Sequence, residues 1–198
     1  YIQKAIDSPS PYIALDSETT ALYPRDGYIL GLSVSYERDK GPYIDTECLD
    51  EDCEEMLQEL FDKKIVIFHN AKFDLAFFEY HFNFKFPRFE DTMLLHYLID
   101  ENPGTHGLKQ LAMKYTKYGD YEKPMYDWIN TYIKANNLTK SQFNWGDIPF
   151  SIMKLYAGMD AVCTFLIYEK FVKIKQNARL AKVYNNILIP GCRFLTDI

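Results

Sequence analysis

Residues Tyr12–Thr20, YIALDSETT, form an apolar stretch that ends in two carboxylates, Asp16 and Glu18. The pattern of Tyr12–Glu18 predicts a β-strand, and side chains two positions apart on a strand point to the same side. Asp16 and Glu18 are therefore expected to project together, where two like charges repel unless a cation lies between them. Mg²⁺ or Mn²⁺ suits this position because hard divalent ions prefer carboxylate oxygens. An Asp-x-Glu pair alone is weak evidence for a metal site, so the prediction of metal binding depends on further acidic residues elsewhere in the chain.

The composition is that of a folded domain with a negative net charge. The 198 residues are 47% hydrophobic and 16% aromatic, and the net charge is −6. This length allows one domain with a real core, or a domain with a helical appendage. Proteins that bind nucleic acid by charge alone are usually basic. An acidic chain that handles nucleic acid therefore needs metal ions to offset the phosphate charge at its site.

The cysteines and the first residues bear on where the protein resides. Neither CxxC pairs nor zinc-ligand spacing occur, which predicts reduced thiols in an intracellular protein. The cysteines in question are Cys48, Cys53, Cys163 and Cys192. The first ten residues lack a basic segment followed by an apolar one, so no signal peptide is expected. No apolar run is expected to span a bilayer, and the start at Tyr1 indicates a fragment of a longer polypeptide.

Four further strands are expected after Tyr12–Glu18. Tyr28–Glu37 and Pro42–Thr46 suit a second and a short third strand, which together make an antiparallel meander. Ile65–His69 is a short apolar run typical of a buried parallel strand that follows a helical crossover. Phe86–Asp91 is expected to be the fifth strand. The order of these elements predicts an α/β fold with a mixed five-stranded sheet flanked by helices.

Helices are expected over most of the remaining chain. A long helix is predicted over Phe150–Gln176, with Pro149 at its first turn. A last helical stretch is expected over Ala181–Ile198, closed or kinked by Pro190. The acidic segment Leu49–Asp62 reads as a surface helix. Its buried side is expected to hold Met56, Leu57, Leu60 and Phe61. Further helices are predicted over Asn70–His81, Thr92–Asp100, Leu108–Thr116 and Tyr126–Asn136, with another start at Thr139.

Two further segments carry acids at helical spacing. Asn70 and Asp74 lie four positions apart at a helix start, so they share a face. Tyr156 and Asp160 are likewise four apart on the predicted long helix. Gly158 between them is unfavourable in a helix interior. It indicates that backbone or a ligand comes close at this point, although core packing explains it equally well.

In their order and gaps, these acidic segments resemble the motifs of the DEDD superfamily of 3′→5′ exonucleases, in its tyrosine-containing branch. Asp16-Ser17-Glu18-Thr19-Thr20 matches the first motif, Asn70 to Asp74 the second and Tyr156 to Asp160 the third. The likeness covers residues 10 to 175 and is greatest to the proofreading domain of family A DNA polymerases. The four motif-bearing acids together are highly specific, whereas any one alone is not.

Other segments extend the resemblance. Asp91–Leu94 resembles the segment after the fifth strand of that domain, and His106–Ala112 resembles the following helix start. Val183–Ile198 resembles the first helix leading into the polymerase domain. The resemblance therefore implies a ribonuclease-H-like fold, with the exonuclease domain over residues 1–180. Residues 181–198 would begin a helix leading toward a polymerase domain that this chain lacks. The segment Tyr118–Phe150 departs most from the family, and its role stays open.

The resemblance also implies a two-metal hydrolysis of phosphodiesters. Asp16, Glu18 and Asp160 would hold one Mg²⁺ or Mn²⁺ ion. Asp16 would also bridge to a second ion, which Asp74 would hold directly or through water. Tyr156 would orient the attacking water, because a phenol near its normal pKa is a poor base. The product would be a nucleoside 5′-monophosphate released from the 3′ end.

Contacts to the substrate follow from the same resemblance. Leu22 lies where the family places an apolar wedge against the terminal base, and the backbone N–H of Thr19 would meet the terminal 3′ hydroxyl. Asn70 would support the substrate or the acids, or it only caps its helix. Lys72 is either a phosphate contact or a solvated lysine. Asp91 is expected to be a helix cap and is left out of the site.

The histidine branch of the superfamily does not fit. That branch needs a histidine five residues before the last aspartate, and this chain has Leu155 there. His96 and Asp100 are four apart and mimic such a motif. They lie before the long helix, so they are expected to be surface helix residues.

The expected function is metal-dependent proofreading of DNA. The expected partners are a single-stranded or frayed DNA 3′ end and a polymerase domain in cis, with no membrane and a monomeric protein. Stacking and apolar contacts to single strands predict little sequence preference. One alternative is an exonuclease that trims RNA 3′ ends, similar to ribonuclease D. Another is an inactive scaffold domain, against which the four intact acids argue. Phage, bacterial and organellar origins all stay open.

Overall fold

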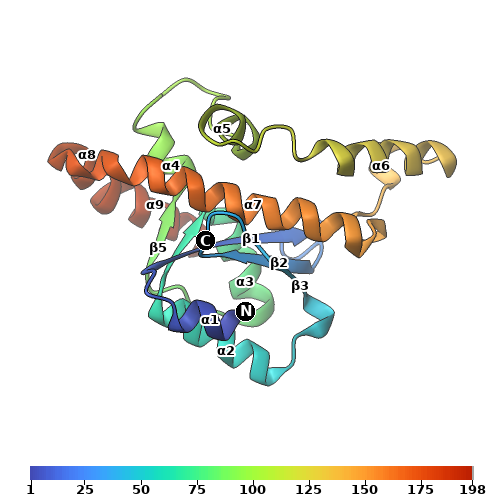
Figure 1. Cartoon of the computed structure of the whole chain (residues 1–198), viewed down its shortest axis with the longest axis horizontal. Coiled ribbons are helices and arrows are strands. Elements are labelled where there is room, and N and C mark those ends of the chain that lie inside the picture. Colours follow the sequence, from blue (N-terminus) through green and yellow to red (C-terminus); the bar gives the residue numbers. More distant parts are fainter. Residues whose placement is uncertain (198) are drawn as a thin grey trace.

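The computed structural model describes residues 1–197, and at its centre lies a five-stranded sheet of order β3-β2-β1-β4-β5 (Figure 1). The middle strand β1 is antiparallel to β2 and parallel to β4. β3 pairs antiparallel with β2, and β5 pairs parallel with β4. The expected meander joined to parallel strands is therefore confirmed. The strands are β1 (Tyr12–Thr19), β2 (Ile29–Ser35), β3 (Tyr43–Asp45), β4 (Ile65–Phe68) and β5 (Phe89–Asp91).

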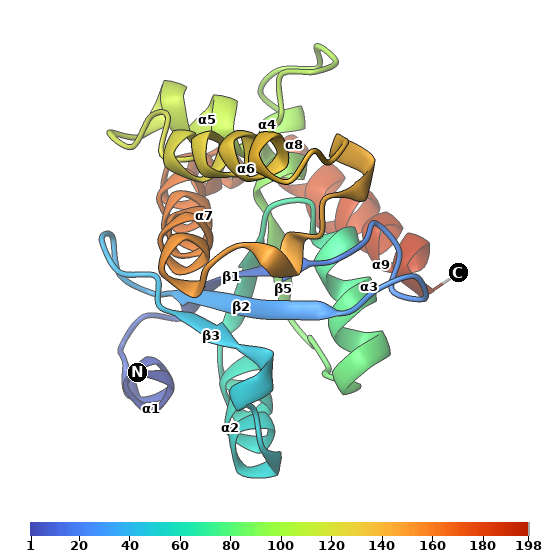
Figure 2. The same ribbon diagram turned by 90° about the vertical axis from the view of Figure 1, so that its right-hand side faces the viewer.

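Helices cover both faces of the sheet, as Figure 2 shows. The long helix α7 lies on one face, with α5 and α6 outside it, while α1, α2 and α3 pack on the other. The helices before α7 are α1 (Ile2–Asp7), α2 (Glu51–Lys63), α3 (Ala71–Phe82), α4 (Thr92–Tyr97), α5 (Leu108–Tyr115) and α6 (Lys123–Ala135). Those from α7 onward are α7 (Phe150–Phe171), α8 (Ala178–Val183) and α9 (Ile189–Asp197). Short 3₁₀ turns occupy Thr46–Cys48, Lys140–Gln142, Trp145–Asp147 and Val172–Gln176.

The alternation along β1 decides which helix each side chain meets. Ile13 and Leu15 belong to the apolar core beneath the sheet, which α1, α2 and α3 cover. Ala14 belongs to the second core, on the side of α7 and α5. Because the side-chain period of a strand is two, Asp16 and Glu18 continue the row of Ala14. The strand thus delivers both carboxylates to the face on which α7 lies.

Asp91, at the end of β5, caps two helices at once. Its carboxylate accepts hydrogen bonds from the backbone N–H groups of Met93 (2.7 Å) and Leu94 (3.2 Å) at the start of α4. It also accepts from Asn70 (3.3 Å) and Ala71 (2.8 Å) at the start of α3. The prediction of a capping role for Asp91 is confirmed. The alternative that Asn70 caps α3 with its side chain is wrong, because Asn70 makes no such bond and has a left-handed backbone with φ 69°.

Two burial predictions are wrong. His96, expected on a helix surface, is 1% exposed, and its Nδ1 lies 2.8 Å from Nδ1 of His106. Its ring packs 5.3 Å from the ring of Phe171, because α4 lies under the C-terminal end of α7. Met56, expected on the buried side of α2, is exposed, whereas the other three apolar residues of that side are buried. Neither position has a local signal, because burial here depends on elements that are distant in sequence.

Two expected helices are interrupted near their ends. The long helix ends at Phe171 and continues as the 3₁₀ turn Val172–Gln176. The last helical stretch is divided into α8, a π-helical segment Tyr184–Leu188 and α9, with Pro190 in the first turn of α9. A π-helical turn directly before a proline leaves room for the ring. The expected end of this stretch, Ile198, lies outside the described residues.

One expectation about hydropathy is also wrong. Phe150–Gln176 has the length and composition of a membrane-spanning helix, although no apolar run was expected to reach that length. In the fold, 56% of its apolar window is buried inside the domain. Its side chains pack against β1, β4 and α5, as those of a central core helix do.

Two glycines bring α7 into backbone contact with the turn between β2 and β3. A Cβ atom built on Gly158 would lie 2.1 Å from the carbonyl oxygen of Gly41, and one built on Gly41 would lie 2.1 Å from that of Gly158. Two interpretations of Gly158 were open, close approach of backbone or a ligand on the one hand and core packing on the other. The contact with Gly41 supports close approach of backbone. Asp160 lies half a turn further along α7, so this contact sets how close its carboxylate comes to β1.

We predict that Gly158→Ala destabilises the protein by about 2 kcal/mol, because the added methyl group forces α7 away from the hairpin. Thermal or urea unfolding would measure the change. The control is Gly191→Ala in α9, where a Cβ meets no heavy atom within 4 Å. This control should leave stability unchanged or raise it by about 1 kcal/mol, since alanine favours helix over glycine. Equal effects of the two substitutions would contradict the close-contact explanation.

Candidate active site

Three of the predicted acids lie together between β1 and α7. Carboxylate oxygens of Asp16, Glu18 and Asp160 all lie within 4.8 Å of one another. Burial, followed by the charges of Asp160 and Glu18, raises the pKa of Asp16 well above its usual range. Burial and the charge of Asp160 likewise raise the pKa of Glu18. Carboxylates held this close repel one another and favour proton uptake, and the same repulsion favours a bound cation.

Asp74 approaches from the other face of the sheet, on α3. Its Oδ1 accepts hydrogen bonds from the backbone N–H (3.0 Å) and the hydroxyl (2.6 Å) of Ser17, the residue between the two strand acids. It is only 3% exposed, and this burial raises its pKa to about 7 even though the Ser17 bonds act in the opposite direction. The structure thus brings three acids into one cluster and holds the fourth beside it through Ser17.

Tyr156 lies one turn before Asp160 on α7, as its spacing predicted. Its ring is 4.2 Å from the ammonium nitrogen of Lys109. Burial, together with the charges of Asp160 and Glu18, raises the pKa of the phenol above its usual range. Tyr156 therefore keeps its proton at neutral pH. It can donate or accept a hydrogen bond at the site, but it cannot act there as a base.

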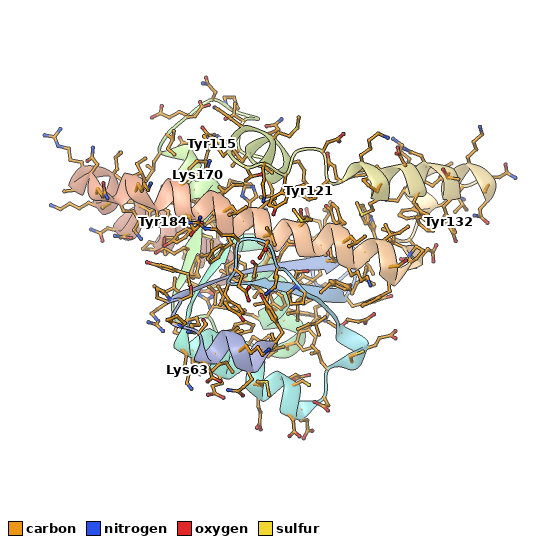
Figure 3. All side chains as sticks on the ribbon, in the orientation of Figure 1. Lys63, Tyr115, Tyr121, Tyr132, Lys170 and Tyr184 are labelled. Carbon is orange, nitrogen blue, oxygen red and sulfur yellow. The ribbon has the colours of Figure 1, made fainter. Side chains whose placement is uncertain are left out.

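Sequence reasoning missed two residues that contact the acid cluster. Both the ammonium of Lys109, on α5, and the hydroxyl of Tyr121 donate to Oδ1 of Asp160. Figure 3 shows Tyr121 on the segment that joins α5 to α6, beside α7. Lys109 belongs to the segment that resembles the family's helix start, but nothing in that likeness assigned it a role. Tyr121 lies in the segment that departs most from the family, so no motif pointed to it.

A cavity of about 310 Å³ opens beside the acids. Leu22 projects into this region from the loop after β1 and is 77% exposed, with no packing partner to hold it down. The Thr19 hydroxyl donates a hydrogen bond to the carbonyl of Ala21 (2.8 Å) and so restrains the backbone at the start of that loop. Trp145, which no motif indicated, forms part of the opposite wall. The lining residues are Ser17, Glu18, Thr19, Thr20, Ala21, Leu22, Phe73, Trp145 and Tyr156.

A wider groove of about 990 Å³ adjoins this cavity and runs over α3 toward α9. Leu22 and Phe73 line both spaces, so the two are adjacent. The groove carries aromatic side chains and charged side chains of both signs, with three basic residues and two acidic ones. Asn70 and Lys72 line it and are not among the residues that line the smaller cavity. Its charged, amide and tyrosine lining residues are Tyr23, Arg25, Asp26, Asn70, Lys72, Glu79, Tyr80 and Lys85.

The donor set fits a hard divalent cation. Three carboxylates from two elements supply only oxygen ligands, which Mg²⁺ and Mn²⁺ prefer over other types. Their positions are fixed by a strand and a helix rather than by loops. The site therefore combines a cation-binding acid cluster with a cavity large enough for part of a polymer end.

We predict that the metal-free protein loses stability as pH rises from 3.8 toward about 7, and that Asp74→Asn reduces this loss. Asp74 binds its proton more tightly in the folded state than in the unfolded state, so raising the pH through this window favours unfolding. The shift of roughly three pH units corresponds to at most about 4 kcal/mol. Melting temperatures in chelator across this pH range would measure it. Equal pH dependence in both proteins would contradict the burial of an ionisable Asp74.

Comparisons with known proteins identify the family of this chain. The family model described as 3′-5′ exonuclease matches residues 2–176. A DNA polymerase of Escherichia phage T5 is 43% identical over 100% of this chain and 24% of its own length. The chain spans only 15% to 24% of the polymerases it matches.

Solved structures show the same fold. Escherichia coli RNase D has a TM-score of 0.71 at 16% identity, covering 98% of this chain and 46% of that one. Brucella melitensis NrnC with bound Mg²⁺ has a TM-score of 0.66 at 17% identity, covering 96% and 83%. The ribonuclease-H-like architecture expected from the sequence is confirmed by these neighbours. From the family match and the phage relative together, this chain belongs to the 3′→5′ exonuclease domain family of family A DNA polymerases.

Proposed function

We propose that this exonuclease domain removes nucleoside 5′-monophosphates from single-stranded or frayed DNA 3′ ends, and that it proofreads for a polymerase domain in cis. The observation that carries the proposal is the cluster of Asp16, Glu18 and Asp160, of which Glu18 lines a cavity together with Tyr156. The relatives supply the DNA context, since those that match are DNA polymerases of phages and bacteria. A protein of this kind acts inside cells, as a monomer joined to its polymerase.

The metal requirement rests on the acids. Asp16, Glu18 and Asp160 would hold one Mg²⁺ or Mn²⁺ ion, and Asp16 with Asp74 would hold a second, directly or through water. Bound divalent ions supply an acidified water molecule and stabilise negative charge on the leaving oxygen. Asp74 now bonds to Ser17, so water is the simpler link between Asp74 and an ion. A relative in fold, NrnC, was solved with bound Mg²⁺.

The protein's own residues would place the reacting groups. Tyr156 retains its proton and so would orient the attacking water by a hydrogen bond, with its ring held beside Lys109. Water would add to the terminal phosphorus and the 3′ oxygen of the preceding nucleotide would leave. Leu22 would press against the terminal base as an apolar wedge. The backbone N–H of Thr19 would meet the terminal 3′ hydroxyl.

The wider groove would carry the strand that leads to the cavity. Aromatic and basic side chains, such as Tyr23, Arg25 and Tyr80, suit a single strand because bases stack on rings and phosphates attract cations. Lys72 would contact a phosphate there, and Asn70 would support the substrate. Contacts of this kind distinguish little between different base sequences. They also require an unpaired end, which a mismatch provides more readily than a matched pair.

The C-terminal stretch would join the domain to its polymerase. Residues 181–198 would begin the connecting helix, after an exonuclease domain over 1–180. In the described part, α9 packs against α3, where Arg193 pairs with both carboxylate oxygens of Glu79. Such a bidentate pair gives the connection a defined direction relative to the domain.

We predict that wild-type protein shortens 5′-labelled single-stranded DNA from the 3′ end with Mg²⁺ or Mn²⁺, and that chelator abolishes the ladder. Asp16→Ala should reduce the rate roughly 1,000-fold, because a lost metal ligand removes several kcal/mol of transition-state stabilisation. Asp52→Ala, an exposed acid of α2, is the control and should keep full activity. Both variants should unfold cooperatively in a melting experiment.

The same assay separates the alternatives. Faster digestion of a mismatched end than of a paired one supports proofreading, whereas equal rates oppose it. Faster digestion of an RNA of the same sequence would favour the RNA-trimming function. An intact protein that digests neither polymer, in metal, would favour the scaffold function.

We predict that Leu22→Ala slows digestion of fully paired 3′ ends about tenfold, since a wedge leucine contributes roughly the contact energy of one buried side chain. Single-stranded DNA should be digested at nearly the wild-type rate, because no pair has to be opened. Ile187→Ala removes an exposed aliphatic side chain outside the site and serves as control. A uniform loss on both substrates would exclude the wedge role.

A further inference from the structure

The acid cluster already contains a positive charge from the protein itself. Lys109 Nζ pairs with Oδ1 of Asp160, and the two side chains are 26% and 6% exposed. It also lies 3.2 Å from the Tyr121 hydroxyl. The charge of this ammonium also reaches the other two acids, because it lowers the pKa of both Asp16 and Glu18, against the effect of burial.

Two aromatic rings contact the same ammonium in the position where it pairs with Asp160. Lys109 Nζ lies 4.2 Å from the ring centre of Tyr156 and 4.8 Å from that of Tyr121. A cation over an aromatic face is stabilised without any carboxylate. The lysine stem is flexible and its ammonium is a compact point charge. Lys109 can therefore leave Asp160 while it remains between these rings.

We propose that Lys109 is the resident counter-cation of the acid cluster, paired with Asp160 in the metal-free protein and displaced toward the rings of Tyr156 and Tyr121 when a divalent ion binds. The inference rests on the proposed role of Asp160 as a metal ligand. One ammonium opposite three carboxylates relieves part of their repulsion and so stabilises the metal-free fold. An entering ion has to compete with that ammonium for the carboxylate of Asp160. Lys109 thereby stabilises the empty site and weakens metal binding.

If the Lys109–Asp160 ion pair has only a structural role, the variants are not expected to bind metal more tightly. If Lys109 only anchors α5 to α7, the pair persists when metal binds, and removal of the lysine loosens Asp160. Metal affinity would then fall or stay the same. Affinity for the metal alone, measured without DNA, therefore distinguishes the two roles, and it does not depend on activity.

The test is titration of Mn²⁺ into metal-free wild type, Lys109→Met and Lys109→Gln by calorimetry, in a mildly alkaline buffer. Both variants should bind Mn²⁺ about tenfold more tightly than wild type, equivalent to about 1.4 kcal/mol, because the competing charge is gone. Without metal they should melt at a lower temperature than wild type, and Mn²⁺ should raise their melting temperature more. Lys114→Met, an exposed lysine of the same helix, is the control and should match wild type.

Each outcome has one meaning. Unchanged or weaker Mn²⁺ binding in both folded Lys109 variants would overturn the counter-cation role while leaving the metal site intact. The polar Gln variant keeps the test valid if the Met variant fails to fold. Absence of Mn²⁺ binding in wild type and in every variant would instead refute the metal site on which the proposed function depends.

Discussion

Repulsion among carboxylates is the constraint on which the rest of this structure depends. Asp16, Glu18 and Asp160 lie within 4.8 Å of one another, largely shielded from water, and like charges in such surroundings are unfavourable without compensation. The fold supplies the opposing energy through two large apolar cores, one on each face of the sheet. Local compensation comes from polar groups, as Lys109 and Tyr121 bond to Asp160. The free energy gained by burying the two apolar cores thus offsets the repulsion among these carboxylates, whose arrangement becomes favourable only when a cation binds.

Much of the architecture could be predicted because it follows from short-range patterns. The alternation of β1 places two acids on one face, and a spacing of four places Tyr156 and Asp160 on one side of α7. The antiparallel meander and the parallel strand after a helical crossover followed from the succession of short apolar segments and turns, because connections of this kind allow few arrangements. The cap that Asp91 makes at the start of α4 is also a local event, since an aspartate before a helix start bonds the first free N–H groups. These features need no knowledge of distant contacts.

Features that could not be predicted are those made by elements far apart in sequence. Lys109 and Tyr121 meet Asp160 across α5 and the segment after it, and no local pattern encodes that meeting. Trp145 reaches the cavity wall from the short 3₁₀ turn Trp145–Asp147. His96 is buried because α7 passes over α4, so helix periodicity alone misassigned it. The long helix also shows that hydropathy cannot distinguish a core helix from a membrane span, since a core helix with apolar neighbours on several sides passes the same test.

The paired glycines at positions 41 and 158 have a consequence for how activity is inferred in relatives. Their carbonyls and Cα atoms meet where no side chain fits, so the two positions are constrained jointly although they lie in separate elements. A homologue that retains every acid but carries a larger residue at either position would hold the last aspartate further from the strand. The presence of all the carboxylates in an aligned sequence is therefore not sufficient evidence that a family member is a competent nuclease. The spacing between backbone segments is as much a part of the catalytic signature as the ligands themselves.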